Sequence, residues 1–173
     1  MESDPKNLNQ KVVWVFFIMR AVPLTLVFLF FAALIAFPAF LEGEDLSLIL
    51  IIVGVFAALV VINIIFSYFW SLLTYKNYLY DLREDGFRKE HGVINKKYVT
   101  IPYERIQNVD IHRNLVDRLF GLSRLKIQTA GGIGPGSYGA MSEGYLPGLD
   151  YQVAEQLRDE LIRRSKGSKE SGV

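Results

Sequence analysis

The stretch IPYERIQNVDIHRNLVDRLFGLSRLKIQTAGG, residues 101–132, carries strand, helix and turn signals in close succession. In its last part apolar and polar residues alternate, with Leu125 and Ile127 on one side and Arg124 and Lys126 on the other. A period of two residues predicts a strand with one buried and one solvent-exposed face. Residues 106–111, IQNVDI, alternate in the same way and predict a second strand. The stretch is too polar to cross a bilayer, and it indicates a folded antiparallel sheet.

A short helix is expected between these two strands. In NLVDRLFGL, residues 114–122, leucines recur at helical spacing, Asn114 is a suitable N-cap and Gly121 a suitable stop. We expect the apolar side of this helix to cover an open edge or end of the sheet. Its arginines, Arg113 and Arg118, should remain in solvent.

Upstream of the stretch, three more strands are predicted. The segments NYLYDL, FRKEH and KKYVTI, residues 77–82, 87–91 and 96–101, are separated by turns that contain Gly86 and Gly92. Strands that follow one another through short turns predict an antiparallel meander.

Downstream, residues 131–148 are rich in glycine and give no strand signal. Residues 148–166, GLDYQVAEQLRDELIRRSK, then predict an amphipathic helix with Asp150 as its cap. The strands and this helix form a predicted domain over residues 76–165, with a flexible tail at 166–173.

Two uncharged runs precede this domain. Residues 21–41 and 46–75 contain no Asp, Glu, Lys or Arg, and each exceeds the roughly 20 residues that a helix needs to cross the hydrocarbon. We expect a transmembrane helical hairpin within residues 21–75, with spans at about 21–41 and 46–70. Buried helices of a soluble core are the alternative. A cleaved signal peptide would need a shorter apolar run than the first one.

Basic residues indicate the orientation of the hairpin. Lys6, Lys11 and Arg20 precede the first span and Lys76 follows the second, whereas the link between the spans has three acidic residues and no basic one. Basic flanks favour the cytoplasm. We therefore expect a multi-pass protein of the plasma membrane in which residues 1–20, the domain and both termini are cytoplasmic. The absence of cysteine agrees with a reducing compartment.

The candidate binding residues are Arg88, Lys89, Lys96 and Lys97, which lie on two strands joined by the turn at Gly92–Asn95. Four cations near an anionic leaflet could each contribute about 1 kcal/mol to lipid binding. The alternative is an ordinary solvated strand face, partly neutralised by Glu90.

The sequence predicts no residues for nucleotide binding, metal binding or catalysis. GPGSYG, residues 134–139, matches the spacing G-x-G-x-x-G, but it does not open directly into a helix and Pro135 removes one amide. His91 and His112 have no cysteine and no ligand spacing, so we expect neither a metal site nor a catalytic triad, and no cofactor. Asn63, inside the second span, is expected to form a hydrogen bond to the neighbouring helix.

Three segments together resemble a known family: YLYDLREDGFRKEHGVINKKYVTIPYERIQNVDIHRN (residues 78–114), RLFGLSRLKIQTAGG (118–132) and LPGLDYQVAEQLRDELI (146–162). They are similar to the bacterial pleckstrin-homology-like, membrane-flanked domain family over about residues 76–162. The resemblance implies an α+β membrane protein: a bent antiparallel sheet or barrel of about seven strands, capped by a C-terminal helix and preceded by a two-helix transmembrane hairpin. Five strands are predicted directly, so one or two more would lie within Gly131–Gly148.

The resemblance implies no enzymatic activity and no small-molecule substrate. We expect a protein-binding or assembly module at the cytoplasmic membrane surface, whose partner is another membrane protein of the family or a second copy, with a role in envelope homeostasis. The alternative is recognition of anionic phospholipid headgroups by the basic hairpin. Nucleic acid is not expected, because the chain has no arginine-rich tract.

Overall fold

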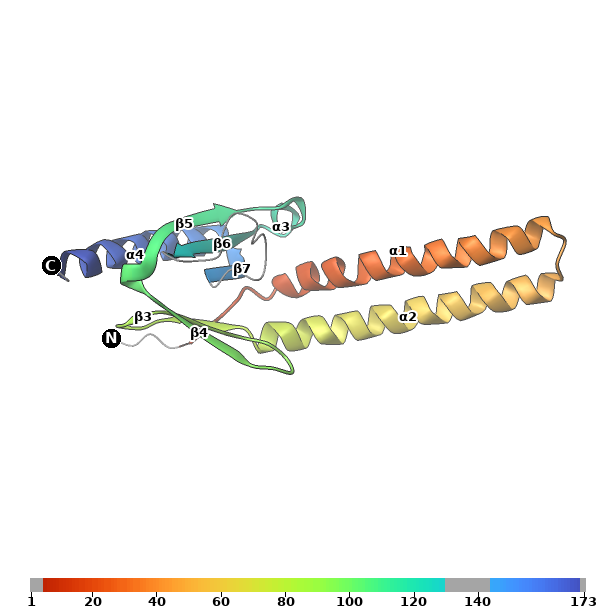
Figure 1. The fold of residues 1–173 in the computed structure, drawn as a ribbon, viewed down its shortest axis with the longest axis horizontal. Coiled ribbons are helices and arrows are strands. Elements are labelled where there is room, and N and C mark those ends of the chain that lie inside the picture. Colours follow the sequence, from red (N-terminus) through yellow and green to blue (C-terminus); the bar gives the residue numbers. More distant parts are fainter. Residues whose placement is uncertain (1–4, 130–143, 172–173) are drawn as a thin grey trace. The chain divides into compact units, whose positions relative to one another are not determined.

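The computed structural model describes residues 5–129 and 144–171, which fall into two compact units (Figure 1). The hairpin unit is Phe16–Leu72. The β unit combines Met1–Val15 with Leu73–Val173. The chain therefore leaves the β unit, forms the hairpin and returns.

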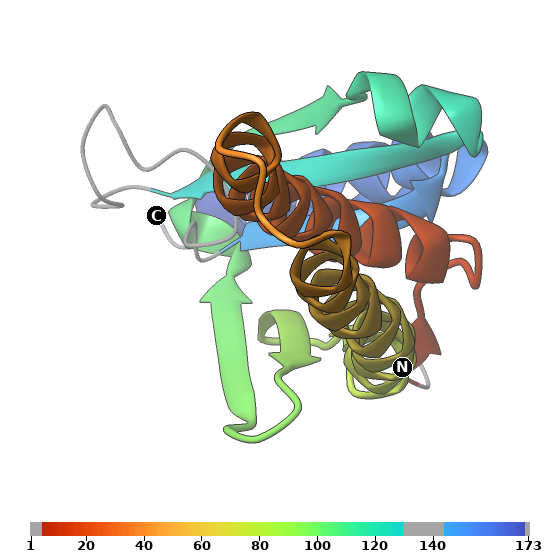
Figure 2. The ribbon, with the colours of Figure 1, turned by 90° about the vertical axis from the view of Figure 1, so that its right-hand side faces the viewer.

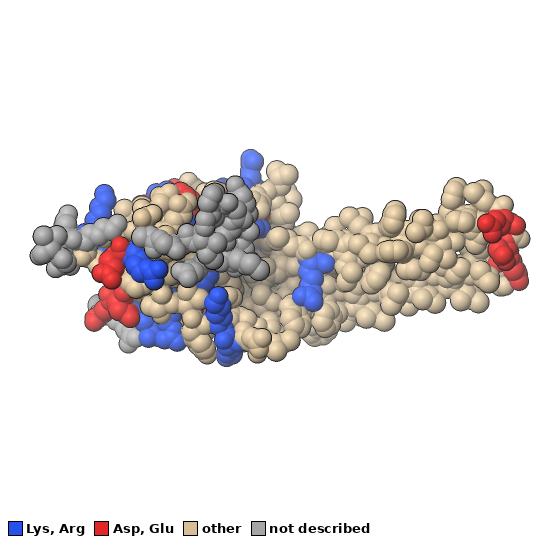
Figure 3. All heavy atoms as spheres, viewed as in Figure 1, with Lys and Arg blue, Asp and Glu red and all other residues tan. Residues whose placement is uncertain are grey.

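Two long helices form the hairpin. They are α1 (Val12–Leu41) and α2 (Leu46–Lys76), of 30 and 31 residues. At 1.5 Å per residue each extends roughly 45 Å, more than the roughly 30 Å of bilayer hydrocarbon. Large apolar side chains are exposed on both helices, and Figure 3 shows their surface almost free of charge up to the acidic turn at its end. This surface suits lipid better than water.

A polar stripe on α2 joins the two helices, which lie side by side in Figures 1 and 2. Asn63 Nδ2 donates to Ala21 O at 3.2 Å and to Thr25 Oγ1 at 3.1 Å. Ser67 Oγ donates to Asn63 Oδ1 at 3.2 Å. The predicted interhelical role of Asn63 is confirmed.

Two antiparallel sheets form the β unit. One has the order β1-β2-β3-β4 and the other the order β5-β6-β7. The strands are β1 (Lys6–Asn7), β2 (Leu79–Leu82), β3 (Gly86–His91), β4 (Lys97–Pro102), β5 (Ile106–His112), β6 (Leu122–Thr129) and β7 (Gly144–Asp150). The helical elements are η1 (Tyr103–Arg105), α3 (Leu115–Leu119) and α4 (Tyr151–Ser171). The predicted α+β architecture is confirmed.

The five strands predicted directly are all present, and two more complete the sheets. β7 begins at Gly144, inside the glycine-rich segment, and pairs with β6. The other added strand is β1, which pairs with β2. Residues 130–143, including the motif Gly134–Gly139, lie outside the described residues.

The N-terminal segment belongs to the β unit, whereas the sequence suggested a separate segment over residues 1–20. Besides the β1 pairing, Asn9 N donates to Gly148 O at 2.9 Å, and its side chain donates to both carboxylate oxygens of Asp150 at 2.8 Å. Leu8 and Val12 are buried. The hairpin is thus inserted between the first two strands of the sheet.

An apolar core lies between the sheets and α4. It includes Phe87, Ile106, Leu122, Leu125, Leu146, Leu149, Ala154 and Leu161, each at most 2% exposed. The last helix, predicted to be amphipathic, buries Ala154, Leu157 and Leu161, while Val153 stays exposed. Ser165 Oγ adds a hydrogen bond to Ile106 O at 3.0 Å.

Helix α3 forms where predicted, but its leucines do not cover the sheet. Leu115 and Leu119 are 78% and 83% exposed, whereas Asp117 is 1% exposed. Asp117 pairs with Arg124 of β6 at 2.6 Å and accepts a hydrogen bond from Asn114 N. Because this buried ion pair fixes the inward side of α3, the leucines point outward.

Candidate functional site

The structure does not bring the four predicted cations together on one surface. Arg88 lies opposite Thr100 and Lys89 opposite Val99 in the β3–β4 ladder. Adjacent residues of a strand point to opposite faces, so Arg88 and Lys89 serve different surfaces. Lys89 is 2% exposed, and its Nζ donates to Tyr145 O at 3.1 Å. The sequence pattern did not reveal this inward position.

The other three cations have different surroundings. Arg88 Nη2 lies 2.7 Å from Glu90 Oε1, and its guanidinium lies 5.3 Å from the centre of the Tyr98 ring. Lys96 and Lys97 are exposed at the β3–β4 turn. Of the four, these two lysines form the accessible basic surface.

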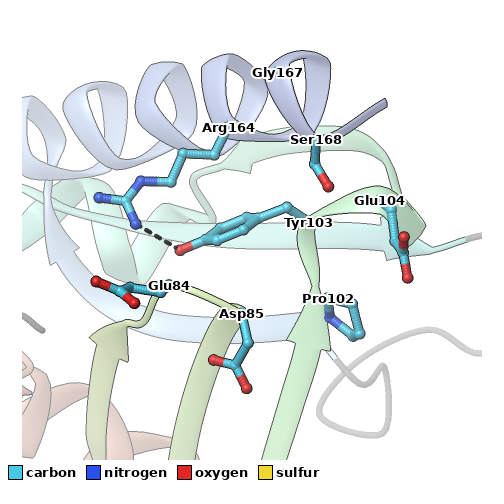
Figure 4. A pocket seen from close by; sticks show the side chains of 8 residues that line it. All are labelled: Glu84, Asp85, Pro102, Tyr103, Glu104, Arg164, Gly167 and Ser168. Atoms are coloured by element: carbon cyan, nitrogen blue, oxygen red, sulfur yellow. Dashed lines mark hydrogen bonds between the residues drawn. The ribbon is translucent and has the colours of Figure 1, made fainter. Parts of the chain in front are cut away.

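A cavity of about 560 Å³ opens beside the C-terminal half of α4 (Figure 4). We call it the α4 cavity. It is lined by Glu84, Asp85, Pro102, Tyr103, Glu104, Arg164, Gly167 and Ser168. The lining thus comes from the β2–β3 turn, from the end of β4 with η1, and from α4, three segments that are distant in the sequence.

Tyr103 and Arg164 form the fixed part of the α4 cavity. Arg164 Nη1 donates to the Tyr103 hydroxyl and to Arg83 O, both at 3.1 Å, and Nε donates to Glu160 Oε1 at 2.6 Å. The Tyr103 hydroxyl donates to Arg83 O at 2.8 Å. Burial raises the pKa of Tyr103, although Arg164 opposes this, and the hydrogen bond from Arg164 lowers the pKa of Glu160. At neutral pH the phenol is therefore neutral and Glu160 is ionised.

The rim of the α4 cavity is acidic. Glu84, Asp85 and Glu104 are exposed, and Figure 4 shows their side chains around the opening. Among the described lining residues the one cation is Arg164, which is already paired with Glu160. The rim therefore favours a basic or hydrogen-bond-donating group of a partner.

A second cavity, of about 310 Å³, shares Arg164 with the α4 cavity. It is lined by Lys6, Tyr80, Asp81, Leu82, Val153, Gln156, Leu157, Glu160 and Arg164. Helix α4 therefore contributes to the lining of both cavities. Within the described ranges, no three His, Asp or Glu residues are placed to hold a metal ion.

Beside the α4 cavity, two strands present open edges. β4 is the last strand of its sheet and β5 the first of the other, among the strands that the structure describes. They follow one another through η1, whose Tyr103 lines the cavity. An edge strand has unpaired backbone N–H and C=O groups that can pair with a strand of another chain.

The sequence did not reveal the α4 cavity. Tyr103 lies within the stretch that predicted the sheet, and Arg164 lies within the predicted last helix. The two residues are 61 positions apart, so no local spacing relates them.

Comparisons with known proteins give one family match and one curated relative to describe. The sequence model of the family described as "Bacterial PH domain" matches residues 14–165. The UPF0699 transmembrane protein YdbT of Bacillus subtilis (strain 168) is 29% identical over 103 residues, which are 58% of this chain and 19% of the relative. The chain therefore spans about a fifth of that relative. No solved structure matches.

Proposed function

The chain belongs to the bacterial PH domain family, and on this premise we propose that it is a non-enzymatic adaptor. It is a membrane protein with two transmembrane helices and a PH-like unit. In the proposal, the β unit binds another protein at the cytoplasmic surface of the membrane. The partner is another membrane protein of the family or a second copy of this chain.

The open edge of β4 beside the acidic α4 cavity carries this proposal. β4 offers backbone groups for a partner strand, and its Tyr98 and Thr100 side chains are exposed. The cavity begins where β4 ends, at Pro102 and Tyr103. A partner strand along β4 could therefore place a basic side chain against Glu104 and Asp85. Backbone pairing would supply affinity and the acidic rim specificity.

The relative supports an association with further protein segments. The segment that matches this chain is 19% of the relative, so in that protein the module stands beside a much larger amount of polypeptide. This chain could meet comparable segments on a separate subunit.

The cytoplasmic orientation is also part of the proposal. Because β1 pairs with β2, the chain before α1 and the chain after α2 lie on the same side of the membrane. The basic flanks Lys11, Arg20 and Lys76 favour the cytoplasm for that side. The chain has no cysteine, so single cysteines can test it in intact cells. Glu44→Cys in the acidic turn should react with an impermeant maleimide, and Lys96→Cys should react only after permeabilisation. The reverse pattern would overturn the orientation.

Partner binding can be tested with a photo-crosslinking residue at Thr100, in cells that also express a second, differently tagged copy. Gln152, which is exposed on α4 and lines neither cavity, is the control position. We expect an adduct with the second copy or with another membrane protein of the family at Thr100 and none at Gln152. Glu104→Lys should reduce that adduct at least fivefold. Asp159→Lys makes the same change of charge outside the cavities and should leave the adduct unchanged.

If Thr100 forms no more adduct than Gln152, or if both charge reversals act alike, the β4 edge and the α4 cavity do not bind the partner.

Recognition of anionic headgroups by the basic hairpin is a second candidate, in a reduced form. Lys96 and Lys97 are exposed, and Ile94 beside them is 79% exposed. Lys89 is buried and cannot contribute from its observed position. Two lysines would contribute about 2 kcal/mol with an anionic leaflet. If a fluorophore at Asn95 responds equally in zwitterionic and anionic nanodiscs, this candidate fails.

A further inference from the structure

Helix α3 displays an apolar face that no described residue of the β unit covers. Leu115 and Leu119 are 78% and 83% exposed. They are four residues apart, so they lie on one face of the helix. Among the described residues after α2, Ile94 is the one other large apolar side chain with comparable exposure, at 79%.

The fold fixes the outward orientation of Leu115 and Leu119. Asp117, on the opposite side of α3, is 1% exposed and lies 2.6 Å from Arg124. Arg124 Nη1 in turn donates to the Tyr145 hydroxyl at 2.9 Å. If either partner of a buried ion pair moves away, the other charge stays buried without a partner, which is costly in free energy. The pair therefore opposes rotation of the helix. Rotation of α3 to bury its leucines would expose this pair.

The solvent-exposed charges of residues 113–119 have one sign. Arg118, between them in the sequence, is exposed. Arg113 lies just before the helix, where its Nε donates to Leu122 O at 3.0 Å and its guanidinium lies 5.3 Å from the Tyr151 ring centre. Asp117, the acidic residue of this segment, faces inward. An apolar face with basic neighbours complements an anionic bilayer surface, where leucine enters the headgroup–acyl boundary and arginine meets phosphate.

Short connections tether the β unit to the hairpin. β2 begins at Leu79, directly after α2 ends at Lys76, and α1 begins at Val12, soon after β1 ends at Asn7. The β unit is thus held at the membrane by both ends of its own hairpin, and insertion of a small helix needs no separate recruitment.

We propose that the face formed by Leu115, Arg118 and Leu119, here called the α3 face, docks into the headgroup region of the anionic leaflet beside the hairpin. The α3 face acts as a third membrane contact that limits the rotation of the β unit on its two connections. This contact is distinct from partner binding at β4 and the α4 cavity, and it can fail while that proposal holds.

The chain allows a direct test, since its 173 residues contain no cysteine. Leu119→Cys and the control Gln152→Cys are labelled with an environment-sensitive fluorophore and placed one copy per nanodisc, in phosphatidylcholine with or without one quarter phosphatidylglycerol. At position 119 we expect at least twofold quenching by a lipid-borne spin label and at least fivefold protection from iodide, relative to position 152. Added to the labelled Leu119→Cys chain, Arg118→Glu should at least halve the lipid quenching in anionic discs.

Three outcomes would overturn the proposal. One is equal iodide access at the two positions. Another is lipid quenching at position 119 that neither phosphatidylglycerol nor Arg118→Glu changes. The third is protection that develops only in discs with two copies, which would assign the α3 face to contact between protein chains. A labelled Leu115→Cys variant repeats the test with Leu119 intact, so that loss of one leucine cannot explain a negative result.

Discussion

Substitution of Gly148 tests whether the N-terminal segment is part of the β unit. Gly148 has a φ of +66°, and a Cβ atom added there would overlap the side chain of Val12. A left-handed conformation costs an L-residue about 1 kcal/mol, and overpacking of a buried site costs about 2 kcal/mol more. Gly148→Ala should therefore lower the free energy of unfolding of the β unit by about 3 kcal/mol.

The chain offers a matched control. Gly121 has a φ of +71°, but a Cβ atom there would meet no atom within 4 Å. Gly121→Ala should therefore cost only the conformational part, about 1 kcal/mol. The difference between the two variants, about 2 kcal/mol, measures the packing of Val12 against Gly148.

Hydrogen exchange in nanodiscs can measure both variants. Amides of β6, the central strand of its sheet, should exchange through opening of the β unit. A loss of about 3 kcal/mol accelerates this exchange on the order of a hundredfold, since 1.4 kcal/mol corresponds to a factor of about 10. Gly121→Ala should give a factor of about 5. Equal acceleration in the two variants would refute the packing of Val12 on Gly148 and the inclusion of the N-terminal segment in this unit.

Three other perturbations have defined outcomes. Asp117→Ala leaves Arg124 without its buried partner and should cost the β unit about 3 kcal/mol; a loss below about 1 kcal/mol by urea unfolding in nanodiscs would contradict a fixed α3. Asn63→Leu removes two hydrogen bonds between α1 and α2 and should weaken the association of the two helices by about 1 kcal/mol. Ile62→Leu, on the exposed side of α2, is the control. The distance between the helices is followed by resonance energy transfer, and equal effects of the two substitutions would contradict the interhelical contact. Burial raises the pKa of the Tyr78 phenol in the folded protein, so the unfolded chain loses the phenolic proton at a lower pH. The contribution of Tyr78 to the free energy of unfolding is therefore complete below about pH 10 and declines as the pH rises further. Tyr78→Phe, which also removes the hydrogen bond to Tyr145 O, should lower stability at pH 7 by about 1 kcal/mol and flatten the decline above pH 10; an unchanged slope would show that Tyr78 does not cause it.

The strands were predictable where one face of a sheet is buried and the other is not. Alternation in residues 124–129 identified β6, and turns at Gly86 and Gly92 separated β2, β3 and β4. β1 gave no signal, because two residues cannot show a period. β7 was hidden by its composition: it contains Gly144, Pro147 and Gly148, and five of its seven residues are buried.

The candidate site was less predictable than the fold. Alternation alone does not decide which side of β3 is buried, and Lys89 lies on the buried side with its Nζ on Tyr145 O. The hydrogen bond between Tyr103 and Arg164 joins positions far apart in the chain. The α4 cavity exists only once folding brings α4 beside η1 and the β2–β3 turn.

By itself, the sequence determined the two spans, the antiparallel sheet that follows them and the closing helix. These features depend on free energies that are summed over neighbouring residues: transfer of uncharged runs into hydrocarbon, burial of alternate side chains and capping of helix ends. The tertiary structure decided that the N-terminal segment completes the sheet, that Lys89 points inward and that Leu115 and Leu119 point outward. Each of these depends on a contact between distant positions, such as Asn9 with Asp150, and the energy of such a contact exists only once the chain has folded.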